Sequence, residues 1–284
     1  MYLDQYRIDG TINYDMNPCF TIPHTYPNFQ EKLEEFQTHL VDLVNNKECK
    51  TFYKFGDGDY FFLKKESVGS AGVGKRALSK SYDEIKHEEF VEGVDKNDYM
   101  TCEIYPENVG KLKQVSNKGI DYPAEYGYGL VANKWLTRTF AGRIGLIGAG
   151  EKLDLIKELL KRPDYKNYLG LDDFNDYIHI PQKFACDDID ATEKMVAEQL
   201  KNSTSDIFLV GIGHVKSALL HRLKEHKNAV YLDVGSSIDA LAGIIDYNRP
   251  YFGGWKNYRV GGYDYEGLDL LQADLWGTSY ETVY

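Results

Sequence analysis

One pattern repeats through the second half of the chain and restricts what it can fold into. A short apolar run is followed by a turn rich in glycine or polar residues, and then by a stretch with helical spacing. Short apolar strands that alternate with helices of about 10–15 residues are typical of βαβ units and a parallel sheet. The runs are residues 143–147, 177–180, 207–210 and 229–232. We therefore predict an α/β fold, with a Rossmann-like, largely parallel sheet flanked by helices in a single large domain.

The first half fits the same fold with less regular spacing. Its expected elements are helices over 28–46, 79–94 and 106–115 and strands over 51–55 and 99–104. In the second half, we expect helices over 151–160, 190–200 and 214–226, of which the second begins at a capping box formed by Asp190 and Glu193.

The ends of the chain differ from its middle. Residues 1–27 are rich in Tyr, Pro and Asn without periodicity, and we interpret them as an irregular N-terminal arm. Residues 28–250 then form the α/β domain. Residues 251–284 are aromatic and glycine-rich, and we expect them to pack on that domain.

Composition excludes several classes of protein. The formal charge of −11 argues against nucleic-acid binding, which needs clustered Lys and Arg. No uncharged apolar run approaches the roughly 18 residues of a membrane span, and no secretory signal begins the sequence. The four cysteines are far apart and form no CxxC pair, as is common for proteins of the reducing cytosol. We expect a cytoplasmic protein with no nucleic-acid partner and no membrane span.

Two carboxylates follow the run 51–55 directly, in Gly56-Asp57-Gly58-Asp59. Asp57 and Asp59, separated by one glycine at the end of a strand, can both approach one cation. Mg²⁺ and Mn²⁺ prefer oxygen ligands, often one or two carboxylates together with substrate phosphates. We predict a metal site here, with Gly56 and Gly58 leaving room for a bulky ligand. The alternative is an acidic hairpin turn.

A glycine-rich stretch at 69–75 ends in Lys75 and Arg76. It has the spacing of a phosphate-binding P-loop, but Arg76 stands where the magnesium-binding Ser or Thr is required. No apolar strand precedes it directly. We therefore interpret it either as a loop that brings Lys75 or Arg76 to a donor phosphate, or as a plain surface loop.

Two Gly-x-Gly turns follow apolar runs, at Gly148/Gly150 and Gly211/Gly213. Such a turn lets a phosphate approach the N-terminus of the next helix, where unpaired N–H groups favour anions. Neither turn has the third glycine of a dinucleotide-binding fingerprint. Both can equally be ordinary tight β–α turns.

Four polar residues near the last two runs are further candidates. His214 begins the helical stretch after residue 213 and is a candidate ligand contact or general base. Asp233 and Asp239 can each accept a proton from a hydroxyl or bind a ribose or sugar hydroxyl. Ser236 is a candidate ligand contact, although a helix N-cap is the simpler role for it.

Several of these segments together resemble the GT-D-type glycosyltransferases. Residues 54–59, Lys-Phe-Gly-Asp-Gly-Asp, resemble the family's Arg-Phe-Gly-Asp-Gly-Glu signature. Residues 209–214 are similar to its strand–glycine turn, and residues 233–240 to its Asp-hydrophobic-Gly-Ser segment. Residues 249–251 are similar to the Arg-x-Tyr that often follows. The segments occur in the family's order.

The resemblance implies a Rossmann-like enzyme that transfers a sugar from a nucleotide donor to a glycan or glycoprotein hydroxyl. It associates Asp57 and Asp59 with a metal ion (Mn²⁺ or Mg²⁺) and with the diphosphate of a UDP- or GDP-sugar. The expected mechanism is a displacement at the anomeric carbon, with Asp233 or Asp239 as the base and His214 as the next candidate.

This chain departs from the signature at two positions. Asp59 replaces Glu and is one methylene shorter, and Lys54 replaces Arg and lacks its bidentate fork. These departures leave the donor and the metal dependence open. The alternatives are a Rossmann-type oxidoreductase or methyltransferase, or a non-catalytic nucleotide- or glycan-binding module.

Overall fold

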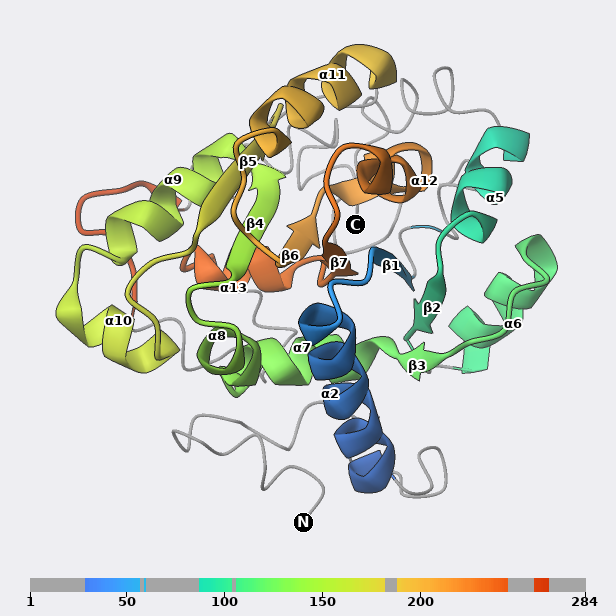
Figure 1. Ribbon diagram of the computed structural model, residues 1–284, viewed down its shortest axis with the longest axis horizontal. Helices are drawn as coiled ribbons and strands as arrows, with labels where there is room; N and C mark the ends of the chain where they lie inside the picture. The colour runs from blue at the N-terminus through green and yellow to red at the C-terminus, as the bar shows by residue number, and fades with distance from the viewer. Residues whose placement is uncertain are drawn as a thin grey trace, which may run out of the picture.

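Seven strands form one sheet, in the order β3-β2-β1-β7-β6-β4-β5, and every described pair is parallel (Figure 1). The computed structural model describes residues 29–56, 59, 87–103, 106–181, 188–244 and 258–265. The strands are β1 (Lys50–Phe55), β2 (Tyr99–Cys102), β3 (Tyr122–Pro123), β4 (Ile144–Ala149), β5 (Asp176–Ile180), β6 (Ile207–Gly211) and β7 (Val230–Asp233). The predicted α/β fold with a parallel sheet is confirmed.

Helices cover both faces of the sheet, because successive side chains of a strand point to opposite faces. In β6, Leu209 belongs to one apolar core, and Phe208 and Val210 belong to the other. The first core also contains residues of α2 (Phe29–Asn45), α7 (Ala124–Ala132), α8 (Trp135–Thr139), α9 (Gly150–Leu159), α10 (Pro163–Leu169) and α13 (Ser237–Leu241). The second contains residues of α5 (His87–Asp95), α6 (Pro106–Val115), α11 (Ile189–Leu200), α12 (Lys216–Leu219) and the 3₁₀ segment η4 (Leu220–Glu225).

Most expected elements are present with small changes in their ends. The helix predicted over 106–115 is α6, and the strand predicted over 99–104 ends earlier, at Cys102. The helix predicted over 79–94 is described only from His87, as α5. Of the predicted terminal segments, 1–27 lies outside the described residues. Residues 258–265 of the C-terminal segment contact α10 and the end of α13, and the domain boundaries stay a prediction.

Two local predictions were wrong. The stretch 214–226 is not one helix but η3 (Gly213–Val215), α12 and η4 in succession. A 3₁₀ turn aligns residues three apart, which lets Leu220 and Leu223 both enter the second core. The cap of α11 is Asp188, whose side chain accepts from Ala191 N, rather than the predicted Asp190.

The elements between α6 and β4 were not predicted from the sequence. Residues 116–142 hold β3, α7 and α8, and every residue of α7 is buried. A helix buried all round has no amphipathic period to detect. In the described part of the chain, no helix combines the length and the apolarity needed to cross a membrane.

Candidate functional site

At two places the chain leaves neighbouring strands in opposite directions. After β1 it continues to β2, whereas after β7 it continues to α13, which packs against β6. After β4 it continues through α9 to the outer strand β5, whereas after β6 it continues through α12 to β7. Ligands of open parallel sheets bind at such switch points, beyond the carboxyl ends of the strands. The β1/β7 and β4/β6 points are therefore the places to look for chemistry.

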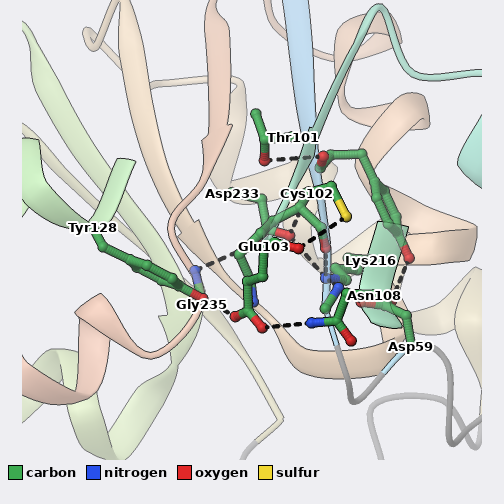
Figure 2. Close-up of polar contacts among 12 residues, drawn as sticks. Asp59, Thr101, Cys102, Glu103, Asn108, Tyr128, Lys216, Asp233 and Gly235 are labelled. Atoms are coloured by element: carbon green, nitrogen blue, oxygen red, sulfur yellow. Dashed lines mark hydrogen bonds and ion pairs between the residues drawn. The ribbon is translucent and has the colours of Figure 1, made fainter. Parts of the chain in front are cut away.

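A buried lysine joins two aspartates at the β1/β7 point (Figure 2). Lys216 Nζ lies 3.2 Å from Asp59 Oδ2 and 3.1 Å from Asp233 Oδ2. It also donates a hydrogen bond to the carbonyl oxygen of Lys54. The Lys216 side chain is only 8% exposed, so these ion pairs are little screened by water or salt.

Further donors complete both carboxylates. Tyr53 Oη donates to Asp59 Oδ1 at 2.7 Å, and Gly56 N donates to Asp59 Oδ2 at 2.9 Å. Asp233 also accepts two backbone hydrogen bonds. Lys54 N donates to its Oδ2 at 3.2 Å, and Gly235 N donates to its Oδ1 at 3.0 Å. Each carboxylate thus contacts three donors, which compensates the cost of burying its charge.

A second buried ion pair lies beside the first. Lys54 Nζ is 3.2 Å from Glu103 Oε1, and both side chains are nearly buried. Glu103 follows the end of β2 and also accepts hydrogen bonds from Tyr128 Oη of α7 at 2.8 Å and from Asn108 Nδ2 of α6 at 3.3 Å. Figure 2 shows Glu103 between these two side chains. Because Lys54 also contacts Asp233 and Lys216 through its backbone, the two ion pairs form one network.

Glycines allow close approach at this network. Gly235 has φ +50°, and a Cβ there would lie 3.0 Å from Lys54 Cε. Gly211 has room for no side chain, because its Cβ would lie 2.6 Å from Ile238 and 2.8 Å from the carbonyl oxygen of Gly235. Packing of the β6 turn against α13 is thus sufficient to require glycine at 211.

The β4/β6 point is formed by the starts of α9 and α13. Lys152 Nζ lies 2.5 Å from Asp239 Oδ1 and joins the two helices. A Cβ on Gly148 would lie 3.4 Å from the Ile238 side chain. A Cβ on Gly150 would lie 3.1 Å from Nδ1 of His179 in β5. Ser236 is at the N-cap position of α13, but its hydroxyl makes no capping hydrogen bond and has no partner among the described residues.

Several predicted site residues cannot be placed. Asp57, Gly58, Lys75 and Arg76 lie outside the described residues, and only the backbone of His214 is described, within η3. The neighbouring Gly213 has φ +60° and open space around its Cβ position, so the turn needs glycine for its backbone.

Of the residues that are described, the structure brings Gly56, Asp59 and Asp233 together at one point and places Ser236 and Asp239 at the start of α13. Sequence reasoning missed the polar residues between them: Tyr53, Glu103, Asn108, Tyr128 and Lys216. Glu103 could have been recognised as an acidic residue at the end of a β-prone run. The predicted strand continued to residue 104, however, and so included Glu103 within it.

The network carries a net negative charge in its described part. Lys54 and Lys216 face three carboxylates, those of Asp59, Asp233 and Glu103. Burial, reinforced by the neighbouring carboxylate of Asp59, raises the pKa of Tyr53 well above its usual value and keeps its hydroxyl a donor.

A neighbouring thiol takes no part in this ionic network. Burial raises the pKa of Cys102 to about 12, so its thiol stays protonated. A thiol is a poor nucleophile, and we exclude Cys102 from the candidate chemistry.

The described residues do not fit a metal ion at Asp59. Its two oxygens already accept from Tyr53, Gly56 and Lys216, and the ammonium of Lys216 lies between it and Asp233. No group of three or more metal-ligating side chains occurs elsewhere in the described residues. Asp57 as a metal ligand stays a prediction.

Comparisons with known proteins add one similarity. No protein-family model matches the chain, and no curated protein matches it. A solved structure described as a new glycosyltransferase from Streptococcus sanguinis is 13% identical, with a TM-score of 0.45, over 72% of this chain and 81% of that chain. A similarity this low carries no conclusion about the activity of this chain.

Proposed function

We propose that the protein is a glycosyltransferase, which moves a sugar from a nucleotide-sugar donor to a hydroxyl of a glycan or glycoprotein. The observation that supports this most is the meeting of two segments that resemble the GT-D family. Lys54 and Asp59, from residues 54–59, contact Asp233 and Lys216 at the β1/β7 point. Lys54 and Asp233 are 179 residues apart in sequence.

The donor's diphosphate needs positive charge near the network. Because the described network has an excess carboxylate, its own lysines are already neutralised. We assign this charge to Lys75 and Arg76 of the glycine-rich stretch. The turns at 148–150 and 211–213, together with Ser236, are proposed contacts of the donor at the β4/β6 point. A UDP- or GDP-sugar is the expected donor.

In the proposed reaction, the acceptor oxygen attacks the anomeric carbon as the bond to the diphosphate breaks. A base takes the acceptor's proton, and the nucleoside diphosphate leaves. Among the candidates, Asp239 suits the base better than Asp233. The Asp239 side chain is 24% exposed, whereas Asp233 is 2% exposed and contacts three donors. We assign Asp233 to positioning and keep His214 as the next candidate for the base.

The test is release of nucleoside diphosphate from a panel of UDP- and GDP-sugars, in Mn²⁺, in Mg²⁺ and in chelator. We expect one donor to be turned over, with kcat reduced about 10²–10⁴-fold in Asp239→Asn, the range for loss of a general base. The control is Lys224→Met, which removes a partly exposed pair with Asp98, remote from the proposed roles.

Three outcomes would change all or part of the proposal. Turnover that is unchanged in Asp239→Asn would remove Asp239 from the base role and direct attention to His214. Donor binding without turnover, seen as a raised melting temperature, would favour a non-catalytic nucleotide- or glycan-binding module. If no nucleotide sugar binds at all, the oxidoreductase and methyltransferase alternatives regain priority.

A further inference from the structure

The ammonium group of Lys216 has the surroundings of a bound cation. It contacts three oxygens, Asp59 Oδ2, Asp233 Oδ2 and the carbonyl of Lys54, which matches its three N–H donors. Lys216 Nζ also lies 4.6 Å from the centre of the Tyr53 ring. Figure 2 shows Lys216 between Asp233 and Asp59.

These oxygens come from separate parts of the chain. Lys54 belongs to β1, Asp59 to the segment after it, and Asp233 to the end of β7, while Lys216 begins the helix after β6. One side chain therefore crosslinks the carboxyl ends of the two strands at the switch point. A compact ammonium suits three oxygens at one point, whereas the planar fork of arginine suits two parallel acceptors.

We propose that Lys216 is a positioning residue whose ammonium, in place of a metal ion, is the cation shared by Asp59 and Asp233. Asp59 then anchors the turn after β1 and does not ligate a metal. This assignment stands without the proposed glycosyltransferase activity. Any metal that the protein uses must be held by other residues.

The first test measures Mn²⁺ binding to the full chain by electron paramagnetic resonance of the free ion. Lys216→Met leaves Asp59 and Asp233 facing each other without their cation. We expect this variant to bind one Mn²⁺ at least about tenfold more tightly than the wild type, as two carboxylates and a carbonyl are ligands that Mn²⁺ accepts. Lys216→Met/Asp59→Asn should lose the gain, and Lys224→Met should bind as the wild type does.

Asp59→Asn alone distinguishes the two assignments. If Lys216 is the cation, Mn²⁺ affinity in Asp59→Asn stays within about twofold of the wild type. A loss of tenfold or more, with unchanged circular dichroism, would make Asp59 a metal ligand and overturn the proposal. So would a Lys216→Met protein that folds and gains no Mn²⁺ affinity.

A measurement on the wild type keeps the proposal testable if the variants do not fold. Reductive methylation of the native protein, followed by peptide mass spectrometry, reports which ammonium groups are accessible. We expect Lys216 to remain unmodified under conditions that label Lys224, whose side chain is 27% exposed. Equal labelling of both lysines would show that the Lys216 ammonium is not held by the three oxygens. Donor turnover is read separately, so loss of the glycosyltransferase proposal leaves these results interpretable.

Discussion

Gly93 of α5 lies directly against Ser217 of α12. A Cβ placed on Gly93 would be 1.8 Å from the carbonyl oxygen of Ser217. Non-bonded atoms cannot come this close, so any side chain at residue 93 would displace the backbone. Ser217 is fully buried and follows Lys216 in the chain. The two helices therefore approach closely at the residue that follows Lys216.

We expect Gly93→Ala to lower the free energy of unfolding by about 3 kcal/mol, at the upper end for overpacking, because backbone must move. The displacement of α12 should also reduce any activity that depends on Lys216. The matched control is Gly110→Ala in α6, where a Cβ meets nothing within 4 Å. That change should stabilise by about 0.5–1 kcal/mol through helix propensity. Urea unfolding of both variants measures the difference, and equal effects would refute the close contact.

Removing the charge of Glu103 should take a carboxylate away from the buried ammonium of Lys54. Lys54 and Glu103 are 12% and 10% exposed, so we expect Glu103→Gln to destabilise by about 3 kcal/mol. The control is Glu92→Gln, whose partner Lys96 is half exposed and whose loss should change stability by less than about 0.5 kcal/mol. Similar effects in chemical denaturation would mean that the Lys54–Glu103 pair is solvated.

The hydroxyl of Tyr53 should contribute to the network beyond the packing of its ring. Tyr53→Phe leaves one oxygen of the buried Asp59 without a donor, and we expect a loss of about 1–3 kcal/mol. Tyr177→Phe removes a hydroxyl that donates to Asp173 on the surface, where water replaces it, and should cost less than about 0.5 kcal/mol. Thermal melts of both variants give the comparison. A smaller loss for Tyr53→Phe than for Tyr177→Phe would contradict the buried hydrogen bond.

Acid should destabilise the protein partly through His221. Burial, with smaller effects from nearby cations, lowers the pKa of His221 from 6.5 to about 4. The folded state therefore keeps this imidazole neutral while the unfolded chain binds a proton below pH 6.5. Its contribution to stability is full above pH 6.5 and is lost as the pH falls towards about 4. Urea unfolding at several pH values should show a shallower decline in His221→Asn, and an unchanged slope would exclude His221 as the cause.

The sequence by itself determined the class of fold and the edge at which chemistry is to be sought. The sequence shows apolar runs, such as 207–210, that are followed by glycine turns and helical stretches. These are local patterns, which can be recognised without knowledge of the fold. Parallel strands place their carboxyl ends together, so Gly56 and Asp233 were predictable as neighbours of the same sheet edge. The buried α7 was not predictable, because a helix buried on all sides has no periodic contrast.

Only the tertiary structure decided what each charged group faces. Strand order places β7 beside β1, and this brings Asp233 to Lys54 across 179 residues. The start of α12 then places Lys216 between Asp59 and Asp233, so that its ammonium contacts both carboxylates. A carboxylate two residues from another suggests a shared cation when only the sequence is considered. Its partner is set by the groups that the fold brings opposite it, and their positions depend on contacts far apart in the chain.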